Sequence, residues 1–461
     1  MVAALACARP ARAEEPTDDA DVPAPAATDL GEPAPTERPP DRPVPDYDGL
    51  PEPGDDAGDV ALWTARILTS PLYLVTEFVL RRPIGWAMTE IERHHLIQYL
   101  IKFLRFGPDE TIMVVPTVFY ELGFRPSIGL YASWDRFLFA ENRISAHAAW
   151  GGSDWLSGSI TDRIEIDDHW QVGATFLARQ RPDYVFGGIG YDATALPRAR
   201  FGAERVEPVL WSAIRYWRSS DVEAEVRYRG IGFFDRTWDD EPSVTQRAEE
   251  TGQALPYGYA TGYEAVSTEL RVDLDTRTPG APPETHARLA AHVGMHGAFG
   301  GLPRLEQWVS WGASATLAAD VLGGHRVLGV TADAHFVSPL DDSDVPFTEL
   351  VDLGGARGLL PGYRPGHVQG YSAVGLTAQY TWALWAFLDA RAYLGTANAF
   401  GVHLEDFDVE RLRLTFGLEL MPRLPSGPVS FTFNFGFATE TFENGAGVNS
   451  FRLAIGSVDL L

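Results

Sequence analysis

The segment Val429–Ala438, VSFTFNFGFA, decides the fold class of this chain. Large apolar residues alternate with small, mostly polar ones: Val429, Phe431, Phe433, Phe435 and Phe437 are set against Ser430, Thr432, Asn434, Gly436 and Ala438. Successive side chains of a β-strand point to opposite faces, so a period of two predicts a strand. This strand therefore has one apolar face and one mostly polar face.

The same alternation runs from residue 111 to the end of the sequence. In residues 266–275 and 411–420, the face opposite the leucines carries charged side chains such as Asp273 and Arg413. Sixteen segments follow this pattern, among them 168–180, 204–217, 371–381 and 383–395.

These segments fit a membrane barrel better than a soluble sandwich. Strands of globular sheets are typically about five or six residues long, whereas many of these runs reach ten or more. Aromatic residues opposite charged ones match an apolar face toward lipid and a polar face toward a lumen. We therefore predict an all-β chain, with a sixteen-stranded antiparallel transmembrane β-barrel over residues 111–461 in the bacterial outer membrane. Outer-membrane lipid and lipopolysaccharide are its expected partners.

Three further segments come before the predicted barrel. Residues 1–13 have a short apolar core that ends in Ala11-Arg12-Ala13, which is interpreted as a residual signal peptide; Cys7 as a lipoprotein acceptor is the alternative. Residues 14–60 are acidic and rich in proline, which predicts a disordered linker. Residues 61–110 are expected to form short amphipathic helices at the periplasmic side, either as simple packing or as the site of a periplasmic protein partner.

The composition argues against nucleic-acid binding, metal binding and catalysis. The chain has a formal net charge of -26 and one cysteine. An acidic chain is not expected to bind nucleic acid, and one cysteine allows neither an internal disulfide nor a Cys-based metal site. His286, His292 and His296 share a strand face, but spacings of roughly 13 Å or more prevent them from sharing an ion. No hydrolase motif is recognised, so no enzyme activity or cofactor is expected.

A long loop near residue 350 carries several motifs in a fixed order. Gly354-Gly355 precede Arg357-Gly358-Leu359 and Pro361-Gly362-Tyr363, and a later segment contains Phe387-Leu388-Asp389. This order resembles the sixth extracellular loop and the next two strands of the BamA/TamA superfamily of outer-membrane assembly factors. Arg181–Gly190, RPDYVFGGIG, is similar to a glycine-rich loop of the same superfamily.

The resemblance implies that the loop folds back inside the barrel, where Arg357 pairs with Asp389. By strand parity Asp389 faces the lumen, where a carboxylate can accept both arms of a guanidinium. The chain departs from the family pattern because Leu359 replaces an aromatic residue and Arg391 stands where the family has glycine.

Two alternatives stay open within this loop. The tip is either Arg357-Gly358 or the stretch Pro361-Gly362-Tyr363. The partner of Asp389 is either Arg357 or its near neighbour Arg391.

The resemblance also implies a function, the insertion or translocation of protein or lipid at the outer membrane. Family members with assembly or secretion roles carry periplasmic βααββ modules, and this sequence resembles the subgroup that lacks them. A passive porin-type channel and a barrel lipid hydrolase are the alternatives. A plugged lumen and a weak seam between the first and last strands favour the first function, whereas an open lumen favours the channel.

Overall fold

The computed structural model describes residues 103–195, 197–238, 240–321, 323–385, 388–422 and 431–457. The predictions for residues 1–13, for 14–60 and for most of 61–110 lie outside this part of the chain, as does Phe387. Phe103 and Leu104 are helical, and the short strand β1 (Arg105–Phe106) follows them. Within the described ranges, no helix has the length and apolar character needed to cross a bilayer.

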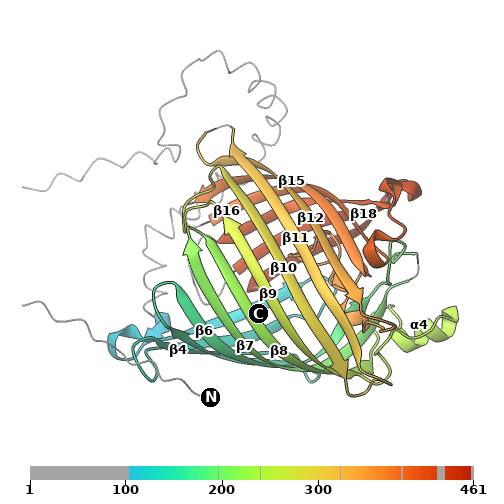
Figure 1. The fold of residues 1–461 in the computed structure, drawn as a ribbon, viewed down its shortest axis with the longest axis horizontal. Helices are drawn as coiled ribbons and strands as arrows, with labels where there is room; N and C mark the ends of the chain where they lie inside the picture. Colours follow the sequence, from blue (N-terminus) through green and yellow to red (C-terminus); the bar gives the residue numbers. More distant parts are fainter. Residues whose placement is uncertain are drawn as a thin grey trace, which may run out of the picture. The chain divides into compact units, whose positions relative to one another are not determined.

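Sixteen long strands follow β1 and form one closed antiparallel sheet (Figure 1). They are β2 (Ile112–Glu121), β3 (Ser127–Asp135), β4 (Asn142–Gly152), β5 (Trp155–Glu165), β6 (Trp170–Phe186), β7 (Ala199–Trp217), β8 (Ser220–Asp235), β9 (Tyr263–Asp275), β10 (His286–Phe299), β11 (Glu306–Asp320), β12 (Arg326–Pro339), β15 (Ser372–Trp385), β16 (Leu388–Phe400), β17 (Arg413–Pro422), β18 (Phe431–Thr441) and β19 (Val448–Ser457). Each pairs with the next along the chain, and β19 pairs with β2. The predicted sixteen-stranded barrel is confirmed.

Some strand boundaries differ from the prediction. β6 and β7 extend well past the predicted 168–180 and 204–217 toward their shared loop. β16 begins at Leu388 instead of 383, so Trp385 belongs to β15. The sequence around Trp385 lacks the Gly, Pro or Asn that marks a turn, and β15 continues through an irregularity next to Ala383.

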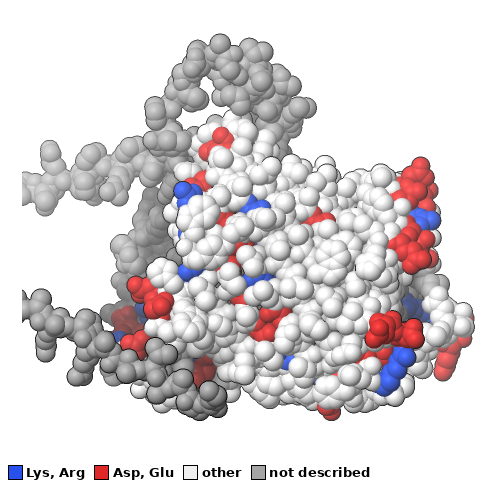
Figure 2. All heavy atoms as spheres, in the orientation of Figure 1, with Lys and Arg blue, Asp and Glu red and all other residues white. Residues whose placement is uncertain are grey.

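The two faces of the barrel wall have opposite character. Large apolar residues on the outer face are more than half exposed, among them Leu130, Leu156, Leu210, Leu317 and Leu394. On the inner face, arginines pair with carboxylates, as Arg229 does with Glu207. Figure 2 shows a wall made mostly of uncharged residues. A closed sheet with an apolar exterior satisfies its backbone groups in lipid, so the chain is an outer-membrane β-barrel whose wall contacts lipid.

The connections at the two ends of the barrel differ in length. The long ones, residues 187–198, 236–262, 340–371 and 401–412, all lie at one end, which in such barrels is the external end. The short helical elements are η2 (Pro108–Glu110) before β2, α4 (Val244–Thr251), η3 (Phe347–Glu349), η4 (Val402–Leu404), η5 (Val409–Arg411) and η6 (Phe442–Asn444). Ser243 and Gln246 form a capping box at the start of α4, which stops this helix from fraying.

Candidate functional site

The connection between β12 and β15, residues 340–371, folds back inside the barrel and is called the plug loop. Its strands β13 (Val351–Asp352) and β14 (Gln369–Gly370) pair with each other at the neck. Beyond the neck, apolar side chains of the loop are fully buried against small residues of the wall: Leu353, Leu360, Tyr363 and Val368 against Ala373, Ala397, Ala399 and Ala438. The lumen is therefore filled by packed side chains where this loop lies.

Tyr363 anchors the plug loop to the last strands of the barrel. Its hydroxyl lies 2.8 Å from the Thr439 carbonyl oxygen and 2.7 Å from Asn449 Oδ1, and its single proton is shared between these two acceptors. The same hydroxyl accepts a hydrogen bond from Arg413 Nη1 at 3.1 Å. Arg413 is 1% exposed and also pairs with Glu440 at 3.1 Å. The Tyr363 hydroxyl is buried, and it acts both as a donor and as an acceptor of hydrogen bonds. These bonds fix the position of the loop.

Gly362 lets the plug loop touch the backbone of β18. A Cβ atom at this position would lie 2.1 Å from the carbonyl carbon of Phe437, a distance that no packed atom can occupy. The Gly362 N–H donates to Thr415 Oγ1 at 3.2 Å, and its carbonyl accepts from Ser450 Oγ at 3.0 Å. The Pro361-Gly362-Tyr363 stretch is thus the part of the loop pressed against the wall.

Arg364 joins the plug loop to the turn after β2. Its Nε donates to the Leu122 carbonyl at 3.0 Å, and Nη1 lies 3.7 Å from Glu241. Arg181, Arg200 and Arg364 all stack over the ring of Phe124, at 4.7, 5.2 and 6.0 Å. The loop therefore contacts the turn that follows the first strand, as well as the last strands.

The glycine-rich stretch Arg181–Gly190 also supports the plug loop. A Cβ atom on Gly187 would lie 1.9 Å from the His367 carbonyl oxygen, so the two backbones touch. The Gly187 N–H donates to the Gly366 carbonyl at 2.9 Å, and the Gly190 N–H donates to the Gln369 carbonyl at 2.7 Å. Close backbone approach explains the glycines.

Two carboxylates hold the neck of the plug loop. Glu349 accepts from the hydroxyl of Tyr263 at 2.5 Å and pairs with Arg229. Asp352 accepts from the backbone N–H groups of Gly354 and Gly366 at 3.0 and 2.8 Å. Desolvation nevertheless raises the pKa of the Asp352 carboxyl to about 7.

The structure places Arg357 in a lumen cavity that Arg391 and Glu419 also line. Arg357 forms no hydrogen bond or ion pair with any residue in the described ranges. Arg391 donates to Gln379 at 3.3 Å and pairs with Glu419. Asp389 lies at the start of β16, opposite Ala383. The pair of Arg357 with Asp389 stays a prediction.

The other predicted loop residues have clear backbone roles. A Cβ atom on Gly358 would lie 2.2 Å from the Leu353 carbonyl oxygen. Gly354 approaches the carbonyl of Arg364 equally closely, and Gly355 has a left-handed φ of 85°. These glycines permit the tight fold of the loop.

The seam between β19 and β2 is short. In the described part of the chain only three register pairs close it: Ala454 with Glu121, Ile455 with Tyr120 and Gly456 with Phe119. By contrast, β10 and β11 share thirteen register pairs. Beside the seam, Arg452 Nε donates to Glu121 Oε1 at 2.7 Å, and both side chains are 4% exposed.

The three histidines singled out in the sequence lie on β10 as separate groups. His286 Nδ1 and the Glu284 carbonyl are 2.8 Å apart, and His296 Nε2 lies 2.7 Å from Ser310 Oγ. His292 stacks on His335, with ring centroids 5.4 Å apart. No group of metal-ligating residues is found in the residues that the structure covers.

Sequence reasoning missed several residues that hold the site together. Arg413 and Arg452 fall on polar faces of their predicted strands, which was a visible signal, whereas Glu121 ends a predicted strand that is largely apolar on both faces. Their partners lie far away in sequence, on neighbouring strands or on the plug loop. Strand parity indicates the face of a side chain and leaves its partner undetermined.

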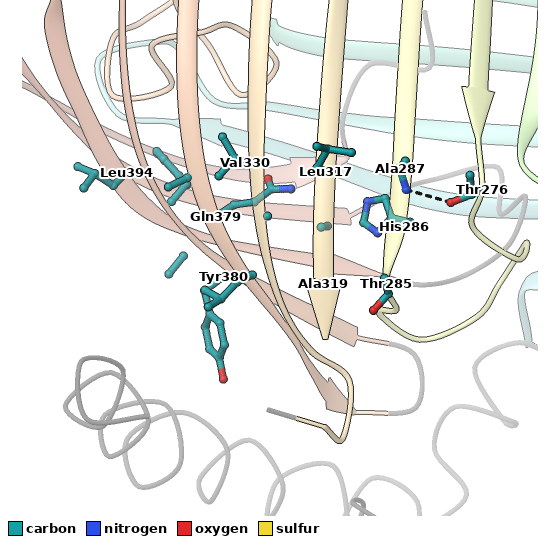
Figure 3. A pocket seen from close by; sticks show the side chains of 16 residues that line it. Thr276, Thr285, His286, Ala287, Leu317, Ala319, Val330, Gln379, Tyr380 and Leu394 are labelled. Atoms are coloured by element: carbon teal, nitrogen blue, oxygen red, sulfur yellow. Dashed lines mark hydrogen bonds between the residues drawn. The ribbon is translucent and has the colours of Figure 1, made fainter. Parts of the chain in front are cut away.

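A hollow of about 840 Å³ lies along β10, β11, β12, β15 and β16 (Figure 3). Leu317, Val330 and Leu394 line it, together with small residues such as Ala319 and Ala378. The three large residues are 49–72% exposed. We therefore assign this hollow to the lipid-facing surface of the barrel.

A solved structure of a known protein shares the fold of this chain. No family profile and no curated protein matches the sequence. Among solved structures, BamA from Haemophilus ducreyi lacking POTRA domains 1-3 aligns with a TM-score of 0.50 and 13% identity, over 75% of this chain and 70% of that one. CdiB from Acinetobacter baumannii and CdiB from Escherichia coli align with TM-scores of 0.47, at 11% and 12% identity, over 75% and 76% of this chain.

The present chain spans 59% and 64% of the two CdiB chains, less than two thirds of either. At these identities the likeness is one of fold. The chain has the barrel fold of BamA, as the resemblance in its sequence implied.

Proposed function

We propose that this protein inserts or translocates protein or lipid at the outer membrane by opening laterally between β19 and β2. The observation that carries the proposal is the three-pair seam. Among the described residues, every other interface between consecutive strands of the barrel has more register pairs, down to seven between β17 and β18. Within the described residues, parting β19 from β2 therefore separates the fewest paired positions.

The plug loop supports the same function. It contacts the turn after β2 through Arg364, and it contacts β19 through Tyr363 and Gly362, so it has contacts on both sides of the seam. Movement of the loop is thereby coupled to the two strands that must part. A lumen that is filled at this level also makes a passive porin-type channel the weaker candidate.

The described residues contain two Ser–His pairs that the hydrolase alternative could use, Ser310 with His296 on the inner wall and Ser338 with His403. A serine nucleophile needs a base that a third group orients. In the described part of the chain no carboxylate hydrogen-bonds the other ring nitrogen of either histidine. We retain insertion or translocation as the proposed function, with lipopolysaccharide and a periplasmic protein as proposed partners.

A disulfide across the seam tests the proposal. Tyr120 and Ile455 face each other in register, and directly opposed residues are close enough for a disulfide. The variant Tyr120→Cys with Ile455→Cys is reconstituted in liposomes, and two rates are measured: the folding of an added unfolded barrel protein and the movement of lipid across the bilayer. We expect oxidation to stop at least one of them and reductant to restore it.

A matched control carries Ala291→Cys with Ala313→Cys, which are opposed on β10 and β11. This disulfide leaves the seam free, so both rates should stay at the wild-type level. Full activity of the oxidised seam variant contradicts lateral opening.

A further inference from the structure

We propose that the barrel lumen contains a binding site for phosphate-bearing anions, between the plug loop and the opposite mouth of the barrel. A cavity of about 410 Å³ lies there, a size suited to a small organic ligand. The plug loop lines it with Arg357, the wall lines it with Arg288 and Arg391, and the turn after β9 lines it with Arg277.

Positive charge dominates the surface of this cavity. Its lining contains four arginines, Arg277, Arg288, Arg357 and Arg391, against two carboxylates, Asp333 and Glu419. The ion-pair partners of Arg277 and Arg288 are Asp275 and Asp273, which do not line the cavity. The Asp275 and Asp273 side chains are 2% and 12% exposed, whereas those two arginines are 46% and 44% exposed. The carboxylates thus lie in the wall while the guanidinium groups reach into the lumen.

Several N–H donors of these arginines remain unused by the protein. Arg277 binds Asp275 through Nε and Nη2, and Arg288 binds Asp273 through the same two atoms. Nη1 of each arginine has no partner in the described residues. The Nε of Arg391 is buried and has no acceptor among the described residues. Arg357 carries a whole guanidinium group without a protein partner in these ranges.

A phosphate group is the acceptor that matches this arrangement. It offers several strong acceptor oxygens and a negative charge, and the fork of a guanidinium binds it in a bidentate way. An anion held by Arg357 and by Arg288 or Arg391 also bridges the plug loop to the wall. The site rests on the cavity and its charges and does not depend on opening of the seam.

Calorimetric titration of the detergent-solubilised full-length protein tests the site. The probes are sodium pyrophosphate and dihexanoyl phosphatidic acid below its micelle concentration, each at fixed ionic strength set with sodium chloride. We expect saturable binding that weakens by about tenfold or more in Arg357→Gln, since a charge-assisted hydrogen bond is lost. Arg357 forms no ion pair with a described residue, so the substitution Arg357→Gln leaves no described carboxylate unpaired.

Arg271→Gln is the matched control, because Arg271 is paired with Glu269 on β9 and does not line the cavity. It removes the same charge and should bind both probes like the wild type. Binding of pyrophosphate alone assigns the site to soluble phosphates, and binding of the lipid alone assigns it to a lipid headgroup. The absence of saturable binding by either probe, or equal weakening by Arg271→Gln and Arg357→Gln, overturns the proposal.

Discussion

Arg452 of β19 donates a 2.7 Å hydrogen bond to Glu121 of β2, and neither side chain reaches solvent to any extent. The pair spans the seam, where three register pairs join the two strands. Arg452 also donates to Asn434 Oδ1 at 3.1 Å, which ties the pair to β18. A seam with few backbone bonds thus has a buried ion pair beside it.

Removing one partner of this pair should destabilise the closed seam. Loss of one member of a buried ion pair costs roughly 3 to 5 kcal/mol, because the other charge stays buried and unpaired. We expect Glu121→Gln to slow crosslinking between cysteines placed at Tyr120 and Ile455, measured as the rate of disulfide formation, because these positions face each other only in the closed seam. The double variant with Arg452→Gln should be closer to wild type than the sum of the two single variants. Equal rates in wild type and Glu121→Gln contradict a role for the pair in closing the seam.

Tyr363→Phe should weaken the attachment of the plug loop to the wall while keeping the apolar contacts of the aromatic ring. The change removes the hydrogen bonds to the Thr439 carbonyl and to Asn449, and it leaves Arg413 short of an acceptor. A buried group without its partner costs about 1 to 3 kcal/mol. The measurement is the rate of proteolysis within residues 340–371, which should rise. Tyr371→Phe is the control, since the hydroxyl of Tyr371 bonds to no described residue; a similar rise in this control contradicts the anchor.

Gly362→Ala should displace the plug loop from the wall. The added Cβ would meet the backbone of Phe437 at 2.1 Å, and neither backbone segment is free to move without breaking hydrogen bonds. We expect overpacking to weaken docking of the plug loop against the wall by about 1 to 3 kcal/mol or more. The measurement is again the rate of proteolysis within residues 340–371, which should rise. Gly232→Ala is the matched control, because nothing lies within 4 Å of its added Cβ. If Gly362→Ala is proteolysed at the wild-type rate, the close contact between Gly362 and Phe437 is contradicted.

The alternation in Val429–Ala438 and its counterparts was sufficient to predict the sixteen strands, because each wall position must face either lipid or lumen. The alternation did not predict the start of β16 correctly. The sequence around Trp385 is apolar and contains no turn residue, so it gives no sign of where β15 ends. The buried contacts of Tyr363 with Arg413 join residues fifty positions apart. Such a contact depends on how the loop returns into the barrel, which no local pattern encodes.

The pair of Arg357 with Asp389, implied by the resemblance, is open to a double-mutant cycle. If the two side chains meet, Arg357→Ala and Asp389→Ala should each increase proteolysis of the plug loop, and the double variant should be little worse than either. Effects that add within about 0.5 kcal/mol indicate independent residues. That result would leave Arg357 in the arginine-lined cavity without a carboxylate partner among the described residues.

Docking of the plug loop should weaken as the pH rises from about 4 to 7. In the docked loop desolvation raises the pKa of Asp352 to about 7, from an ordinary value of 3.8. Between these values the docked state binds more protons than the released state, so raising the pH favours release. Stabilisation from the protonated carboxyl is therefore complete below about pH 4 and is lost once the pH passes about 7.

The measurement is the rate of proteolysis of residues 340–371 by a protease active from pH 5 to 8. This rate should increase across the range, after correction for the pH dependence of the protease itself with a free peptide substrate. Asp352→Asn cannot ionise, so it should flatten the profile. An unchanged profile in that variant would show that a group other than Asp352 carries the titration.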